Sequence, residues 1–123
     1  MKYFILLLSL ALFSCNAQEK NCSKFKTGTF RYTAEELNSW TIIRTEKLQI
    51  EKNSDNGIII KSAIEWKDDC TYTLTYKEVS NSSVNNVIGK KIVVEILDVN
   101  GNKYICQAVS DVMDAKLELI KVE

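Results

Sequence analysis

The sequence predicts an all-β fold, an antiparallel meander of about seven or eight strands that closes into a small barrel or packs as a sandwich. Apolar and polar residues alternate along most of the chain beyond residue 24, which is the period of a half-buried strand. Asn56-Gly57 and Asn100-Gly101 are hairpin dipeptides between such stretches. These observations favour sequential antiparallel strands with short connections.

The expected strands share this alternation and cover residues 25–33, 40–51, 58–66, 70–79, 90–99, 103–110 and 115–122. Residues 67–69 are expected to form a turn, and residues 80–89 the only long polar loop. Thr33-Ala34-Glu35-Glu36 matches a capping box and predicts at most a short helical turn after the first strand.

The chain begins with an apolar segment, residues 3–13, that is too short to span a bilayer, which needs about 20 apolar residues. Such a segment is typical of a secretory signal. Leu12-Phe13-Ser14-Cys15 resembles a bacterial lipobox, which predicts a signal peptide at residues 1–14 and a lipid on Cys15. Cleavage after Ala17 is the alternative, and it would give a soluble periplasmic or secreted protein.

With the lipobox, residues 15–24 form the lipidated N-terminus and tether, and residues 25–123 form a single β domain. Cleavage before Cys15 leaves 109 residues (123 minus 14), enough for one hydrophobic core. No acidic run follows Cys15, so we expect a protein of the bacterial cell envelope that is held on the outer membrane and faces the periplasm. The membrane is therefore an expected partner through this anchor.

The composition argues against several classes of function. The 16 basic and 16 acidic side chains balance, which disfavours a nucleic-acid partner. Histidine, the commonest general base and metal ligand, is absent. No G-x-S-x-G elbow or phosphate-binding loop occurs, and the turn around Asp55 lacks the ligand spacing of a calcium loop. We therefore expect a protein that is not an enzyme and that uses no metal or cofactor.

Three cysteines remain if Cys15 is lipidated, and an oxidising periplasm favours pairing those that can meet. Cys22 lies before the first expected strand and Cys70 at the start of another, where the backbone can adjust to disulfide geometry. Cys106 lies within a strand in phase with Tyr104, which is typical of a buried thiol. We expect a Cys22–Cys70 disulfide, worth about 4 kcal/mol on the chain-entropy model. Three reduced and buried thiols are the alternative.

Arg44 is the most distinctive candidate binding residue. One face of the expected strand over residues 40–51 carries Ile42, Arg44, Glu46, Leu48 and Ile50, and the other carries Thr41, Ile43, Thr45, Lys47 and Gln49. The first face is the more apolar, so Arg44 is expected to point inward, where it could fork onto a ligand carboxylate. The alternative is that Arg44 pairs with Glu46 or Glu65, or lies in water at the barrel rim.

Tyr72 and Tyr76 are the other candidate ligand contacts. They alternate with Cys70 and Leu74 on one face of the expected strand over residues 70–79. If that face lines a barrel, their hydroxyls are the polar groups within reach of a bound molecule.

Three segments resemble a family of small lipoproteins from flavobacteria and their relatives. They are CSKFKTGTF from Cys22, IIR with QIE within residues 42–51, and WKDDCTYTL from Trp66. The resemblance implies an exported β domain of the lipocalin-like meander type, with no established activity. Gly28-Thr29-Phe30 is similar to the G-x-W of lipocalins, with phenylalanine in place of tryptophan.

Two functions stay open from the sequence. One is the binding of a small apolar or amphipathic ligand inside the barrel. The other is that of an accessory module that contacts another envelope protein through the outer strands or residues 80–89. A cavity of roughly a few hundred cubic ångströms favours the first. A filled core beside an exposed apolar patch favours the second.

Overall fold

A computed structural model of the chain describes residues 20–84 and 86–123. The expected signal peptide at residues 1–14, Cys15, the alternative cleavage site after Ala17 and the first part of the tether lie outside the described residues. Within them, no helix is both long and apolar enough to cross a membrane.

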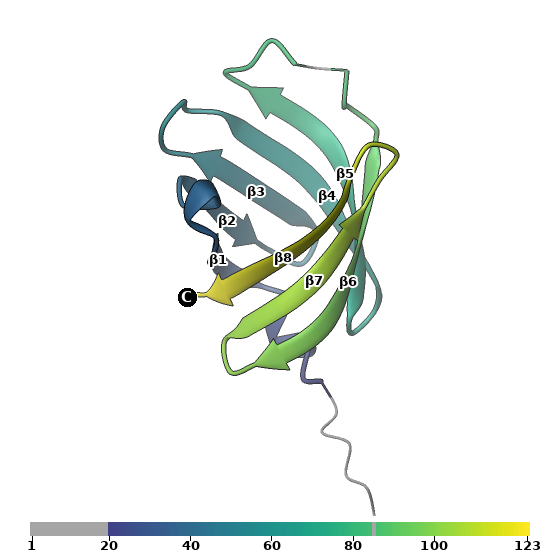
Figure 1. The fold of residues 1–123 in the computed structure, drawn as a ribbon. Helices are drawn as coiled ribbons and strands as arrows, with labels where there is room; N and C mark the ends of the chain where they lie inside the picture. The colour runs from purple at the N-terminus through teal and green to yellow at the C-terminus, as the bar shows by residue number, and fades with distance from the viewer. Residues whose placement is uncertain (1–19, 85) are drawn as a thin grey trace, which may run out of the picture.

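The protein is an all-β barrel, as the alternation predicts (Figure 1). Eight strands follow one another around the barrel, each antiparallel to its neighbours: β1 (Gly28–Tyr32), β2 (Trp40–Arg44), β3 (Leu48–Asn53), β4 (Ile59–Asp68), β5 (Thr71–Ser80), β6 (Lys91–Asn100), β7 (Lys103–Val109) and β8 (Asp114–Lys121). The last strand pairs with the first, with Phe30 opposite Lys121 and Tyr32 opposite Leu119. The barrel is thereby closed, and the alternative of a sandwich is wrong.

One expected strand is in fact two. The chain over residues 40–51 breaks at residues 45–47, where the backbone N–H of Thr45 donates to the carbonyl of Leu48 at 2.9 Å. β2 and β3 then pair, with Arg44 opposite Gln49. The turn reverses the phase of the alternation, so Gln49 is buried while Leu48 and Ile50 are only half-buried. The prediction that Leu48 and Ile50 share the inner face with Arg44 is therefore wrong.

Two short 3₁₀ turns flank β1. η2 (Glu35–Leu37) is the helical turn expected after the first strand. Its N-cap is Ala34 instead of the expected Thr33, whose hydroxyl donates to Glu118 Oε1 at 2.8 Å. η1 (Ser23–Phe25) replaces the expected start of the first strand, which begins only at Gly28.

The two ends of the barrel differ. At one end, η1 inserts the buried ring of Phe25, which packs 4.8 Å from the ring of Tyr104 and 6.3 Å from that of Phe30. The Cys22–Cys70 disulfide joins η1 to the β4–β5 turn at this same end. We call this the plugged end, and it is where the N-terminal segment meets the barrel in Figure 1. The other end, bordered by η2 and the β3–β4, β5–β6 and β7–β8 loops, is the open end.

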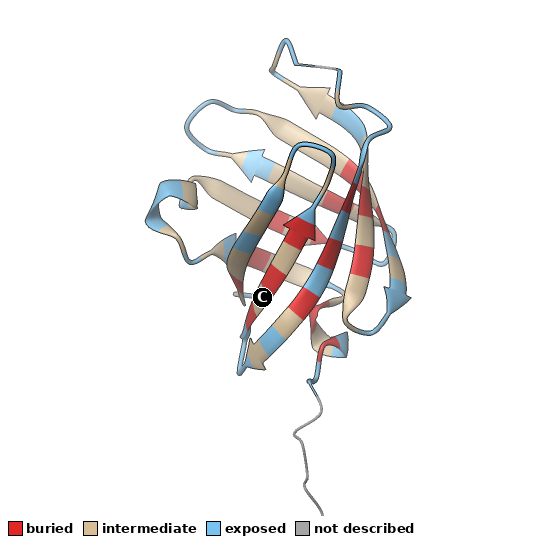
Figure 2. Cartoon of the chain, turned by 45° about the vertical axis from the view of Figure 1, so that its right-hand side comes forward, coloured by how far each residue is buried: buried red, intermediate tan, exposed pale blue. Residues whose placement is uncertain are grey.

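The core fills the interior from the plugged end. Buried positions alternate with half-buried or exposed ones along β5, β6 and β7, as the red bands of Figure 2 show. The buried apolar side chains form one cluster: Cys22, Phe25, Phe30, Ile42, Ile64, Tyr72, Leu74, Ile92, Val94, Ile96, Tyr104, Cys106, Ala108 and Leu119. The polar side chains buried within it are those of Arg44, Gln49 and Ser62.

Candidate ligand-binding site

Arg44 lies inside the barrel, with 2% of its surface exposed. Its Nε and Nη2 both donate to Oε1 of Gln49, at 3.0 and 2.8 Å. Nη2 also approaches the hydroxyls of Tyr72 and Tyr104 at 3.2 and 3.1 Å, and Nη1 donates to the carbonyl of Phe25 at 2.8 Å. The guanidinium is therefore held by neutral acceptors from four different segments of the chain.

Aromatic rings surround the same guanidinium. Its central carbon lies 4.5 Å from the ring centroid of Phe30 and 4.8 Å from that of Tyr72, within the range of cation–π attraction. Trp66 lies 6.0 Å away and packs on Tyr72, with its indole N–H buried and without a hydrogen-bond partner among the described residues. The rings exclude water and partly balance the charge that burial isolates.

Among residues 20–84 and 86–123, no carboxylate forms an ion pair with Arg44. The ion pairs among the described residues are Lys26–Asp69 and Lys61–Glu78, both on the surface. Glu46 and Glu65, the partners expected in the alternative interpretation, are exposed and make no ion pair with Arg44. That alternative is wrong on both counts, because Arg44 is neither paired with an acid nor in water.

A pocket of about 100 Å³ lies above Arg44 on its open-end side, lined by side chains of seven strands and the β7–β8 loop. Its lining includes Arg44, Gln49, Tyr72 and Tyr76 at polar positions and Leu74, Ile92, Val94 and Leu119 at apolar ones. Ligand pockets for drug-sized molecules are roughly 300 to 1,000 Å³. The interior is thus not filled, but the space next to Arg44 suits only a small molecule or one end of a longer one.

A second pocket, of about 230 Å³, continues toward the open end. It shares Tyr32, Glu51, Met113 and Leu117 with the first pocket, so the two pockets adjoin. Leu37, Trp40 and Ile60 complete its lining, which is apolar apart from the Glu51 carboxylate and the Tyr32 hydroxyl. We call this second space the mouth pocket.

Glu51 carries the only carboxylate in the lining of these two pockets. The Tyr32 hydroxyl donates to its Oε1 at 3.0 Å. Burial raises the pKa of Glu51 above its ordinary value, and the hydrogen bond from Tyr32 and the charge of Arg44 only partly offset this. Burial and the neighbouring Glu51 raise the pKa of Tyr32 as well, so its hydroxyl stays a proton donor.

A third space of about 190 Å³ lies at the open end between the β5–β6 and β7–β8 loops. Tyr76 and Met113 separate it from the central pocket, and Lys90 and Lys91 lie at its edge. The expected polar loop over residues 80–89 therefore borders the open end.

The sequence located part of this site. Arg44 points inward as expected, and Tyr72 contacts it directly. Tyr76 is half-buried and lines the pocket nearer the open end, without a hydrogen bond to Arg44. Gln49 was expected to face outward and is instead the main acceptor for Arg44. Tyr32, Glu51 and the hydroxyl of Tyr104 did not emerge from the sequence as site residues.

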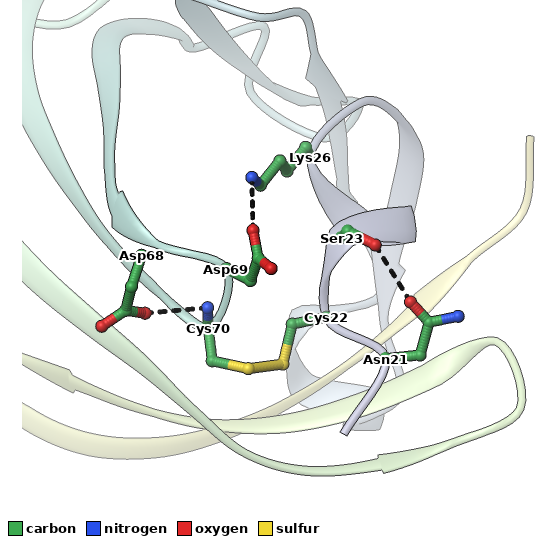
Figure 3. A network of polar contacts seen from close by, with 7 residues as sticks. All are labelled: Asn21, Cys22, Ser23, Lys26, Asp68, Asp69 and Cys70. Carbon is green, nitrogen blue, oxygen red and sulfur yellow. Dashed lines mark hydrogen bonds and ion pairs between the residues drawn. A yellow bond between two sulfur atoms is a disulfide. The ribbon is translucent and has the colours of Figure 1, made fainter. Parts of the chain in front are cut away.

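The cysteines behave as their positions predict. Cys22 and Cys70 form a disulfide with a Cα–Cα distance of 5.2 Å (Figure 3). Beside it, Lys26 Nζ forms an ion pair with Asp69 Oδ1 at 2.8 Å. Cys106 is a buried free thiol, and burial raises its pKa to about 11. A thiol in that state is a poor nucleophile at neutral pH.

No group of three or more cysteine, aspartate or glutamate side chains that could hold a metal ion occurs among residues 20–84 and 86–123. Comparisons of the chain with protein-family models, with curated proteins and with solved structures found no match. The resemblance to the flavobacterial lipoproteins therefore stays a prediction from the sequence.

Proposed function

We propose that the protein is an exported, lipid-anchored and non-catalytic binding protein that takes a small apolar or amphipathic molecule into its barrel through the open end. The observation that carries this proposal is the interior space formed by two adjoining pockets, one beside Arg44 and the other the mouth pocket. The space is closed at one end by η1 and the disulfide, and its walls are mainly apolar. A few convergent polar groups in an otherwise apolar pocket are typical of a ligand site.

The size of the space sets the kind of ligand. The narrow part beside Arg44 is about 100 Å³ and the mouth pocket about 230 Å³, which suits a short alkyl or aromatic group and not a large ring system. Most side chains that line the two pockets are apolar, and burial raises the pKa of Cys106, so its thiol is a poor nucleophile at neutral pH.

The proposed anchor is the lipid on Cys15, with residues 16–21 between it and the disulfide-bonded Cys22. The leader and the lipobox resemblance support this part of the proposal, as does the disulfide, which is typical of exported proteins. Mass spectrometry of the N-terminal peptide tests it. A diacylated or triacylated Cys15 is expected, whereas a terminus at Gln18 would contradict the anchor.

Native mass spectrometry of the protein purified from its own host tests the binding function. We expect a retained small molecule that is released when the barrel is unfolded. The binding function would be contradicted if the purified protein retained no small molecule and also bound none of a panel of short alkyl alcohols, acids and amines.

The second candidate is an accessory module that contacts another envelope protein. Val84, Ile88 and Val112 are exposed on the two loops beside the third space, and Val112 is 88% exposed. Exposed apolar side chains on neighbouring loops favour a docking surface. Cross-linking from residue 112 in intact cells would distinguish this function, because a ligand-binding barrel needs no protein neighbour there.

A further inference from the structure

We propose that the mouth pocket selects an organic amine, with the ammonium group on Glu51 and the apolar part of the ligand against Trp40, Leu37 and Ile60. This inference rests on the proposed binding function and names the chemical class of the ligand. It differs from the expectation drawn from the sequence, in which Arg44 would bind a carboxylate.

Arg44 is poorly placed to bind an anion through two nitrogens, because each of its three nitrogens already donates to a protein acceptor. Gln49, Tyr72, Tyr104 and the carbonyl of Phe25 accept hydrogen bonds from all three of its nitrogens. A ligand carboxylate would have to displace these partners inside the plugged end, leaving them buried without a donor. Unpaired buried polar groups cost free energy, so the exchange gains little.

Glu51 is in the opposite situation. Among the described residues it accepts one side-chain hydrogen bond, from Tyr32, and no lysine or arginine lies within ion-pair distance of it. An ionised carboxylate can accept several more hydrogen bonds. Burial raises its pKa, and the hydrogen bond from Tyr32 and the more distant charge of Arg44 offset this only in part.

The walls of the mouth pocket distinguish an ammonium from a metal ion. A calcium or magnesium ion requires several oxygen ligands, and Glu51 with the Tyr32 hydroxyl supplies too few. An organic ammonium needs one carboxylate, is attracted to aromatic rings, of which Trp40 and Tyr32 line this pocket, and has an apolar body that can contact the remaining surface. The lining therefore matches an amphipathic amine.

Isothermal titration calorimetry with three probes of equal chain length tests the inference: hexylamine, hexanol and hexanoate. The full-length protein is used in phospholipid nanodiscs, with empty nanodiscs as the blank. We expect hexylammonium to bind about tenfold or more tightly than hexanol, as expected of a hydrogen bond to a charged group. Hexanoate should bind more weakly than hexanol, since Glu51 repels it.

Three variants test whether Glu51 and Trp40 cause the preference for the amine. Glu51→Gln should remove the preference for hexylammonium while hexanol still binds, whereas Glu65→Gln, an exposed carboxylate on β4, should leave the preference intact. Trp40→Leu keeps the pocket apolar and removes an aromatic face, so it should weaken hexylammonium more than hexanol.

The outcomes separate this inference from the function it rests on. Equal binding of the three probes, or tightest binding of hexanoate, overturns the amine preference and leaves the binding function in place. A preference that survives Glu51→Gln also overturns it. If none of the probes binds and the native protein retains no ligand, the proposed function fails together with the inference.

Discussion

The plugged end and the open end of this barrel each contain a charged side chain, and the two side chains differ in how many protein partners they have. At the plugged end, Arg44 is almost fully enclosed and every nitrogen of its guanidinium has a partner from the protein. At the open end, Glu51 is half-buried and has one such partner. The comparison teaches that the more buried charge, that of Arg44, is used to hold the barrel together, whereas the Glu51 carboxylate keeps unused hydrogen-bonding capacity.

The largest expected effect comes from removing the guanidinium. Arg44→Leu leaves Gln49, Tyr72, Tyr104 and the carbonyl of Phe25 without their shared donor. We expect a loss of about 3 to 5 kcal/mol in the free energy of unfolding, because each buried acceptor left without a donor costs about 1 to 3 kcal/mol. Urea denaturation followed by tryptophan fluorescence measures it, and a loss under about 1 kcal/mol would contradict the architectural role.

The disulfide is expected to have the next largest effect. Cys22 and Cys70 are separated by 48 positions, so their bond removes about 4 kcal/mol of loop entropy from the unfolded chain on the chain-entropy model. The double variant Cys22→Ala/Cys70→Ala should lose about 2 to 4 kcal/mol in denaturant unfolding. Treating the native protein with a reductant is the matched control and should give the same midpoint as the double variant.

Gly28 tests the closure of the barrel at the plugged end. Its φ of +131° is one that residues with a side chain rarely adopt, and a Cβ there would lie 2.5 Å from the carbonyl oxygen of Glu123. We expect Gly28→Ala to cost about 2 to 3 kcal/mol, from backbone strain and this clash together. Gly101→Ala is the control, because Gly101 also has a positive φ but has open space around it, and it should cost only about 1 kcal/mol.

The smallest expected effect has the opposite sign. The pKa of Glu51 is raised by folding, so its ionised form destabilises the native state. This cost is absent below the ordinary pKa of a glutamate, grows as the pH rises toward the folded-state pKa, and is complete above it. Glu51→Gln should therefore raise the melting temperature at neutral pH by a few degrees, roughly, and the gain should vanish in acid.

Calorimetric scans of both proteins from acid to neutral pH measure this difference. A melting temperature that falls on Glu51→Gln at neutral pH would mean that the carboxylate stabilises the open end, and the contrast with Arg44 would then be lost. A carboxylate kept at a cost to stability is the pattern expected of a functional group.

Much of the fold could be predicted from the sequence because alternation is a local property. The two faces of β5 follow directly from Tyr72 and Leu74 against the threonines between them. The disulfide was also predictable, since Cys22 and Cys70 lie near strand ends while Cys106 lies within a strand. Each of these inferences depends on neighbours within a few positions along the chain.

The inward positions of Gln49 and Glu51 could not be predicted because the turn before them has a weak sequence signal. Thr45-Glu46-Lys47 contains no glycine, asparagine or proline, so nothing marks it as the β2–β3 turn. Without that turn, residues 48–51 are assigned to the opposite faces of the strand. Gln49 is then expected to face outward, and Glu51 is not recognised as a residue of the interior. A one-residue change of phase exchanges the inner and outer faces of a strand.

The plug was missed for a different reason. Phe25 and Phe30 belong to the expected first strand by composition alone, yet Phe25 turns back as part of η1 to fill the end of the barrel. The need for a side chain that fills the end of the barrel becomes apparent only once all eight strands are in place. Tertiary demands of this kind are outside the reach of local periodicity.

The pairing of β1 with β8 has a consequence for how other molecules can contact the barrel. Every strand is paired on both sides over at least part of its length, so the closed barrel offers a second copy little unpaired backbone on which to add a strand. A protein that binds the outer wall of the barrel must therefore contact mainly side chains. Single substitutions of these side chains can change the selectivity of that binding without altering the backbone.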